Sequence, residues 1–234
     1  MITPHVEQHR INQGAFFRNI ILGGQDGLVN VLGIILGIAV ATNSTSIVIL
    51  AGLAAAFAES VSMAAVAYTA SRAELEHYEA EVKREIYEME HLSDREREEI
   101  VQIYRDKGFT GKLLDQVVDK ICSNKKVWLE TMMREELRLE DPREGMSPLK
   151  QGILVGVSAI IGSIIPLAPF FFFPVSLSIL IALVISLALL FLFGAYKSHQ
   201  TSGKWFHGGM ELMLIGGAAA LAGYIVGSLL HISV

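Results

Sequence analysis

The sequence predicts an all-α, polytopic membrane protein with five transmembrane helices and one helical, water-exposed domain inserted after the second. Apolar residues make up 52% of the 234 residues and charged residues only 18%, whereas a soluble domain carries about a quarter charged residues. The charge is also segregated, because residues 71–150 hold 15 of the 19 Lys and Arg and 20 of the 24 Asp and Glu. One part of the chain is therefore expected in water and the other in lipid.

Five apolar stretches are long enough to cross a bilayer, which takes about 20 residues in a helix. They cover approximately 19–42, 47–70, 150–170, 174–196 and 208–231. The first is too long for the core of a signal peptide, so we expect it to be retained. The chain then divides into residues 1–70 with a tail and two spans, an insert at 71–147, and residues 148–234 with three spans.

The distribution of basic residues predicts the orientation. The N-terminal tail carries Arg10 and Arg18, the link before the last span carries Lys197 and Lys204, and the C-terminal end carries none. The positive-inside rule then places the N-terminus and the insert in the cytoplasm. We expect a plasma membrane if the protein is prokaryotic and a vacuole-type membrane if it is eukaryotic; the short tail favours the former.

The insert is predicted to consist of helices. Neither Pro nor Gly occurs between Gly52 and Gly108, so the second span should continue as one helix to about His91. Ser93 and Glu96 form a capping-box pattern. Further helices are expected at 94–107, 112–122 and 125–139.

The net charge and the single cysteine limit the partners. Acidic residues outnumber basic residues in the insert, which argues against a nucleic-acid partner. Cys122 is the only cysteine, so no intrachain disulfide is possible.

Two carboxylates lie within the first two apolar stretches. Asp26 is followed one turn later by Asn30, and Glu59 is followed at i+4 by Met63. A carboxylate in a bilayer costs several kcal/mol unless it is paired, hydrated, protonated or bound to a cation. Facing each other, these side chains would suit a divalent transition metal. The alternative is that Asp26 lies at the interface, Glu59 is a protonated packing residue and Met63 fills space.

The insert repeats carboxylates at helical spacing. From spacing alone, these positions are typical of solvated helix faces. They are Glu81, Glu85 and Glu88, then Glu96 and Glu99, and finally Met132, Met133 and Glu136 on one face of the last helix.

Two further motifs leave alternatives open. Glu74-x-x-His77 and Glu88-x-x-His91 match the spacing of ferritin-like di-iron sites, although both lie on one predicted helix and a di-iron bundle takes one from each of two. They support a membrane-anchored di-iron oxidase or iron store as the alternative function. The pairs Gly33-x-x-x-Gly37 and Gly223-x-x-x-Gly227 favour close helix packing, either within one subunit or between two.

Four segments resemble the vacuolar iron transporter family, and the similarity runs over essentially the whole chain. They are residues 19–28 with Asp26-Gly, 58–63 with Ala-Glu-Ser-Val-Ser-Met, 71–78, and 128–137 with the pattern Trp-Leu-x-x-Met-Met-Arg-x-Glu-Leu. The resemblance implies a dimeric, five-span fold in which a cytoplasmic domain collects Fe²⁺. The ion would leave the cytosol along the dimer interface, coupled to protons.

The resemblance also implies which residues bind the ion. In the membrane it points to Asp26 and Met63, and the family's membrane glutamate falls on Ala55, so we expect Glu59, one turn later, to take its place. The cytoplasmic ligands fall on Glu85, Glu88, Glu96, Glu99, Met132, Met133 and Glu136.

The expected function is therefore export of Fe²⁺, and also of Mn²⁺, by proton antiport. We expect no enzymatic activity and no prosthetic group, with Fe²⁺, Mn²⁺ or Zn²⁺ as the bound and transported ion. The expected partners are these ions, protons, the lipid bilayer and a second copy of the chain in a homodimer.

Overall fold

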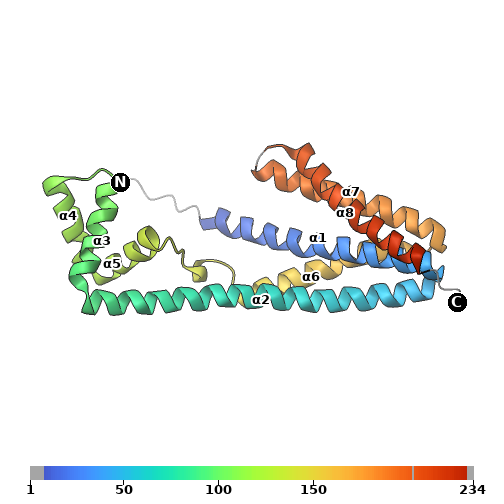
Figure 1. The fold of residues 1–234 in the computed structure, drawn as a ribbon, viewed down its shortest axis with the longest axis horizontal. Helices are drawn as coiled ribbons and strands as arrows, with labels where there is room; N and C mark the ends of the chain where they lie inside the picture. Colours follow the sequence, from blue (N-terminus) through green and yellow to red (C-terminus); the bar gives the residue numbers. More distant parts are fainter. Residues whose placement is uncertain (1–7, 202, 231–234) are drawn as a thin grey trace. The chain divides into compact units, whose positions relative to one another are not determined.

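The computed structural model of the chain describes residues 8–201 and 203–230, and within these ranges every regular element is helical. The chain divides into two compact units. The membrane unit comprises Met1–Thr69 and Ser147–Val234, and the inserted unit comprises Ala70–Met146. Figure 1 shows the helices of both units.

The membrane unit is built from five helices that are long and apolar enough to cross a bilayer. Helix α6 continues into a 3₁₀ turn, η3 (Ala168–Phe171). The five spans predicted from the sequence are thus confirmed, and the chain is a multi-pass membrane protein. The helices are α1 (Gln8–Thr42), the first part of α2 (Thr45–His91), α6 (Pro148–Leu167), α7 (Val175–Thr201) and α8 (Trp205–Leu229).

Glycines let α1 approach two neighbouring helices closely. A Cβ atom at Gly27 would lie 2.2 Å from the carbonyl oxygen of Ala159, and one at Gly23 would lie 2.2 Å from that of Val155. No side chain fits at such distances, so α1 and α6 pack backbone against backbone. This contact holds the part of α1 that carries Asp26.

The two small-x-x-x-small pairs pack against each other within the subunit. A Cβ atom at Gly223 would lie 2.0 Å from the oxygen of Gly33, and one at Gly227 would lie 2.1 Å from that of Gly37. Of the two alternatives that the sequence left open, the structure therefore uses these glycines for the contact between α1 and α8 in one chain.

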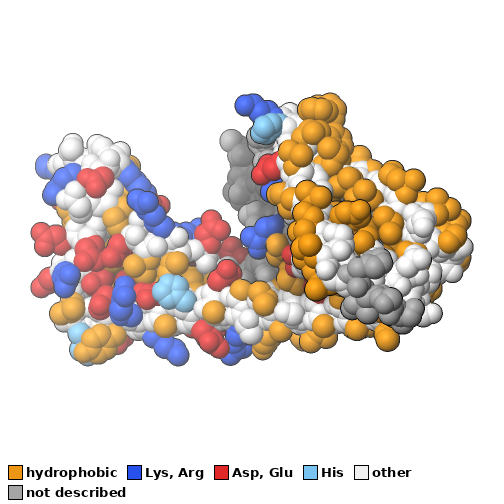
Figure 2. Space-filling model, turned by 45° about the vertical axis from the view of Figure 1, so that its right-hand side comes forward, with side chains coloured by type: hydrophobic (Ala, Val, Ile, Leu, Met, Phe, Trp, Pro, Cys, Tyr) orange, Lys and Arg blue, Asp and Glu red, His pale blue; other side chains and the backbone are white. Residues whose placement is uncertain are grey.

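Helix α2 packs against α6 and exposes apolar side chains elsewhere on its surface. The hydroxyl of Ser60 donates a 2.8 Å hydrogen bond to the carbonyl oxygen of Gly156. Elsewhere on α2, the side chains of Leu50, Phe57 and Val61 are exposed. Figure 2 shows hydrophobic side chains over most of the drawn surface of the membrane unit, while acidic and basic side chains gather on the inserted unit. These exposed apolar faces are suited to lipid.

The inserted unit consists of short helices around a small apolar core. The end of α2 is followed by α3 (Ser93–Asp106), α4 (Gly111–Cys122), α5 (Lys125–Thr131), a π-helical turn η1 (Met132–Glu136) and a 3₁₀ turn η2 (Pro142–Glu144). The core includes Met89, Ile100, Val118, Trp128 and Met132.

Two local predictions for the insert were wrong. The N-cap of α3 is Leu92, and no side chain caps it; Ser93 lies inside the first turn. The carboxylate of Glu96 is buried in the unit instead of reaching back to a cap. The expected helix at 125–139 ends earlier, because the amide of Leu139 bonds to the oxygen of Met133 in a widened turn, and the backbone is left-handed at Arg138 (φ 54°).

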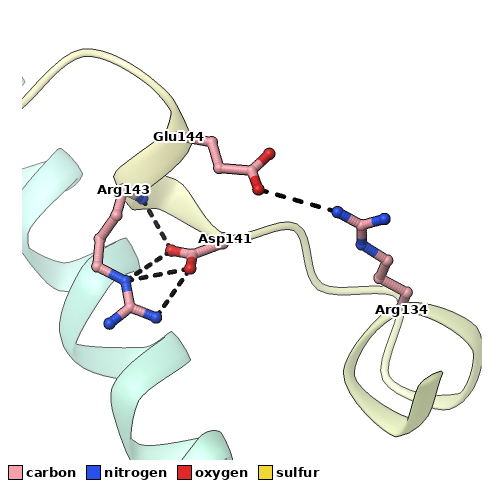
Figure 3. A network of polar contacts seen from close by, with 4 residues as sticks. All are labelled: Arg134, Asp141, Arg143 and Glu144. Carbon is pink, nitrogen blue, oxygen red and sulfur yellow. Dashed lines mark hydrogen bonds and ion pairs between the residues drawn. The ribbon is translucent and has the colours of Figure 1, made fainter. Parts of the chain in front are cut away.

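The segment after η1 is fixed by ion pairs (Figure 3). Asp141 accepts hydrogen bonds from the backbone amide of Arg143 at 2.9 Å and from its Nε at 2.8 Å. Arg143 also lies over the ring of Tyr78 on α2, 5.5 Å from its centroid, and Glu144 forms a 3.9 Å ion pair with Arg134. These contacts fasten the end of the insert to α2 and to the π-turn.

Candidate metal sites

The inserted unit brings five of the predicted glutamates together in two groups. One group is Glu85, Glu88 and Glu96, and the other is Glu96, Glu99 and Glu136; in each, one oxygen per residue lies within 4.8 Å of the others. A zinc-sized ion binds carboxylate oxygens at about 2.0–2.2 Å, so opposite oxygens would be about 4.4 Å apart. Small side-chain movements would therefore suffice to coordinate an ion in either group.

Three elements supply these carboxylates. Glu85 and Glu88 lie three residues apart on α2, Glu96 and Glu99 lie three residues apart on α3, and Glu136 ends the π-turn. Residues at i and i+3 share a helix face, so the break at Leu92 lets α3 bring its acidic pair to that of α2. Glu96 belongs to both groups and links them into one acidic cluster.

Burial and mutual repulsion make this cluster unfavourable without a cation. The side chain of Glu96 is 2% exposed, and that of Glu85 is 1% exposed. Burial, followed by repulsion from neighbouring glutamates, raises the pKa of Glu96 to about 7 and that of Glu136 to about 7. The pKa of Glu85 is raised for the same two reasons. Bound divalent cations would relieve both costs.

Two buried oxygens in the cluster have unused bonding capacity. The Oε2 atoms of Glu85 and Glu96 are buried and accept no hydrogen bond from the part of the chain that the structure describes. Buried polar atoms are normally satisfied. Such atoms in a carboxylate cluster are suited to ligating a metal ion.

The two predicted methionines are buried and lie in the same π-helical turn as Glu136. Met132 is fully buried in the apolar core with Met89 and Trp128, and Met133 is also buried. Both belong to the π-turn that ends at Glu136. Such turns are rare and often occur at functional sites, but the period of the sequence gave no sign of this one.

The histidines of the di-iron alternative lie outside both groups. His77 approaches Glu81, with 3.9 Å between its Nδ1 and Oε1, and His91 stacks on Tyr87 with ring centroids 4.1 Å apart. Among the described residues, each group consists of glutamates alone. The structure therefore gives no support to a pair of Glu-x-x-His ligands.

The membrane unit brings the predicted polar residues of α1 and α2 together. Asn30 Nδ2 donates a 2.5 Å hydrogen bond to Glu59 Oε1, and Asp26 interacts electrostatically with the same carboxylate. Glu59 Oε2 is buried and has no hydrogen-bond partner within the described ranges. Met63 is half-buried one turn further along α2.

The neighbourhood of Glu59 differs from that of Ala55. Ala55 packs against an apolar cluster that includes Val31 and Ile35, so a carboxylate one turn before Glu59 would face apolar side chains in this chain. Asn30 also lines a groove of about 710 Å³ between α1 and α8, whose other lining residues are mostly apolar. The polar contact of α1 with α2 thus lies beside an open apolar groove.

Two arginines near the acidic cluster were not predicted from the sequence. Arg95 Nε lies 3.6 Å from Glu99 Oε1. Arg84 Nη2 lies 2.9 Å from Glu81 Oε2 and 3.6 Å from Glu85 Oε1, and its Nε lies 3.9 Å from Glu88 Oε2. The signal was its spacing, since Arg84 follows Glu81 by three residues and precedes Glu88 by four on one helix.

The fold and these sites define a multi-pass helical membrane protein. Its inserted unit holds a cluster of acidic side chains, and its membrane unit holds the Glu59 carboxylate, which accepts a hydrogen bond from Asn30. The model of the VIT family matches residues 17–228, and the chain belongs to this family. The resemblance stated from the sequence motifs is thereby confirmed.

Named relatives match nearly the whole chain. It is 33% identical over 225 residues to vacuolar iron transporter 1 of Arabidopsis thaliana, covering 96% of this chain and 89% of that protein. It is 30% identical over 239 residues to the vacuolar iron transporter of Toxoplasma gondii, covering 98% and 79%. It is 31% identical over 238 residues to that of Plasmodium falciparum, covering 98% and 87%.

Proposed function

We propose that this protein is a transporter that moves Fe²⁺, and also Mn²⁺, out of the cytoplasm in exchange for protons. The observation that carries the proposal is the acidic cluster of the inserted unit, where five glutamates from three elements form two groups that share Glu96. Membership of the VIT family supports transport as the activity. The ion is cargo, so the proposal includes neither a prosthetic group nor an enzymatic reaction.

The first step is capture of the hydrated ion by the inserted unit, which faces the cytoplasm in this proposal. Carboxylates attract the divalent ion and replace part of its water. The buried sulfurs of Met132 and Met133 add soft ligands if the π-turn opens towards the cluster. Such a mixed set favours borderline transition metals over Ca²⁺.

The second step is passage through the membrane unit. Asp26 and Glu59 provide carboxylate oxygens, Asn30 an amide and Met63 a thioether. The contact of Asn30 with Glu59 and the unpartnered Oε2 of Glu59 support a binding site at this level. We propose that two copies of the chain form the transporting unit, as the family resemblance implies.

Protons and metal ions compete for the same carboxylate lone pairs, which makes exchange natural. Metal binding requires unprotonated carboxylates and therefore displaces protons. Protonation of Asp26 and Glu59 from the far side of the membrane would release the ion there. The proton then returns to the cytoplasmic side as the next ion binds.

Flux in proteoliposomes tests the proposal. The purified chain is reconstituted with the inserted unit outward, an acidic interior and a pH dye inside, and Fe²⁺, Mn²⁺, Zn²⁺ or Ca²⁺ is added outside. Uptake of Fe²⁺ and Mn²⁺ with a rise in internal pH is expected, together with little uptake of Ca²⁺. Liposomes without protein give the leak rate.

Two results would contradict the proposal. Uptake at full rate without a pH gradient and without a change in internal pH would show a uniporter. Absence of uptake together with the spectroscopic signature of a bridged di-ferric centre would instead support the di-iron alternative.

A further inference from the structure

Arg84 occupies the acidic cluster as a built-in cation. Its guanidinium contacts Glu85 and Glu88, which belong to one of the two carboxylate groups. The shortest of its three ion pairs, at 2.9 Å, is with Glu81, which belongs to neither group. Arg84 therefore lies between Glu81, which is outside both groups, and the carboxylates that would bind an ion.

The two partners differ in exposure to solvent. The side chain of Arg84 is 50% exposed, whereas that of Glu85 is 1% exposed. A half-exposed arginine has a long, flexible stem and room to turn, while the buried carboxylate is held by its surroundings. If the two separate, Arg84 is the one that moves.

We propose that Arg84 and Glu81 form a counter-ion switch for the acidic cluster. In the metal-free protein the guanidinium neutralises part of the charge of Glu85 and Glu88. When a divalent ion binds, Arg84 turns away and pairs with Glu81 alone. This inference rests on the proposed function, because it assumes that the cluster binds the transported ion.

The physical reason is competition for the same oxygens. Arginine keeps its charge at all physiological pH values, so near a bound divalent ion it raises the free energy of the loaded state. It also lowers the free energy of the empty state, in which carboxylates otherwise repel each other. Both effects weaken binding and speed release, which suits a site that passes its ion on. Arg84 is in this sense a positioning residue and not a ligand.

The two residues should have opposite effects. Arg84→Gln removes the competing charge, and we expect the affinity for Mn²⁺ to increase by about threefold or more. Glu81→Gln removes the partner with which Arg84 pairs in the metal-bound state. Arg84 should then stay beside Glu85 and Glu88, and the affinity for Mn²⁺ should fall by about threefold. In the double variant, Glu81→Gln should have no further effect, because there is no arginine left to hold.

The experiment titrates Mn²⁺ into the full-length protein in detergent by calorimetry and measures release into a chelator by stopped flow. Arg97→Gln is the matched control: Arg97 lies in the same unit, forms its ion pair with Asp119 and is 43% exposed. We expect it to change affinity by less than about twofold. Arg84→Lys keeps the charge and should stay close to wild type, whereas Arg84→Gln should also slow release.

Each other outcome overturns the inference in a distinguishable way. Weaker binding by Arg84→Gln would show that Arg84 supports the site. Equal weakening by Glu81→Gln with and without Arg84 would make Glu81 a ligand. Unchanged affinity in Arg84→Gln would exclude the switch while leaving the proposed function intact. A wild-type protein that binds no Mn²⁺ would overturn both.

Discussion

Asn30 on α1 donates a hydrogen bond of 2.5 Å to Oε1 of Glu59 on α2, and the other oxygen of Glu59 is buried without a partner among the described residues. A half-buried carboxylate with one oxygen in a hydrogen bond and the other without one is oriented, and its second oxygen can still bind a proton or a cation. In an apolar span that arrangement costs several kcal/mol unless a cation or a proton completes it. Glu59 is therefore the first residue to test in the membrane unit.

Replacing Glu59 with Gln should lower Fe²⁺ flux in proteoliposomes by about tenfold or more, because the amide keeps the shape but loses the charge that binds the ion. Binding of Mn²⁺ to the acidic cluster in the same protein should not change, as calorimetry would show. Glu211→Gln on α8 is the matched control, since Glu211 is an exposed carboxylate in another span. Normal flux in Glu59→Gln would make Glu59 a packing residue.

A second prediction concerns the acidic cluster. Changing Glu96, Glu99 and Glu136 together to Gln should weaken Mn²⁺ binding by about tenfold or more, because three charged ligands become neutral. The control replaces three exposed acids of the same unit outside both groups, Glu98, Asp115 and Glu130, by their amides. The cluster is not a metal site if both triple variants titrate like the parent.

The raised pKa values of Glu96 and Glu136, about 7 against an ordinary 4.5, predict a pH dependence. Between these values the folded metal-free protein binds more protons than the unfolded chain, so the free energy of unfolding should fall as the pH rises through this window. Metal affinity should rise over the same window, because binding requires the unprotonated carboxylates.

Thermal unfolding of the metal-free protein at about pH 5 and about pH 8 checks the first part, and Mn²⁺ titration at both values checks the second. The triple amide variant should lose most of both dependences. A metal-free protein that is equally stable at the two pH values would show that these carboxylates titrate normally.

A fourth prediction concerns the contact between α1 and α8. Gly223→Ala places a Cβ atom 2.0 Å from the oxygen of Gly33, so the helices must separate, at a cost of about 1–3 kcal/mol. Gly217→Ala is the matched control on the same helix, because its Cβ would meet only Leu187 at 4.0 Å. Only Gly223→Ala should lower the temperature of thermal unfolding in detergent. Equal unfolding temperatures for the two variants would mean that α1 and α8 can separate there without loss of stability.

The elements that follow from length and composition could be predicted from the sequence. A span needs about 20 apolar residues because lipid cannot satisfy the hydrogen-bonding groups of the backbone. The stretch predicted at 174–196 starts one residue before α7 (Val175–Thr201) and otherwise lies within it. The long second helix could be predicted because neither Gly nor Pro occurs between Gly52 and its end at His91. Whether a helix continues depends on the residues within it, so the length of this helix can be predicted from the sequence.

Features that depend on contacts between elements could not be read in this way. Spacing alone indicated solvated faces for Glu85 and Glu96, and only the family resemblance pointed to metal binding. Their approach requires the break at Leu92, which carries no capping signature. The π-turn at Met132–Glu136 was missed because it depends on the packing around it. Arg84 was missed because a cation among acids on a helix usually indicates only surface ion pairs.

The glycines of α1 also restrict how this protein can change over generations. Gly23 and Gly27 lie against α6, and Gly33 and Gly37 lie against α8. Asp26 and Asn30 lie within the stretch of α1 that these four glycines span. A mutation that enlarges one of the four glycines therefore displaces the polar residues as well as loosening a helix pair. Compensation would require a second change on the facing helix, where glycines or backbone atoms already leave nothing smaller to substitute. Inherited variation should accordingly accumulate on the outer faces of α2 and α7 and remain scarce along this one helix.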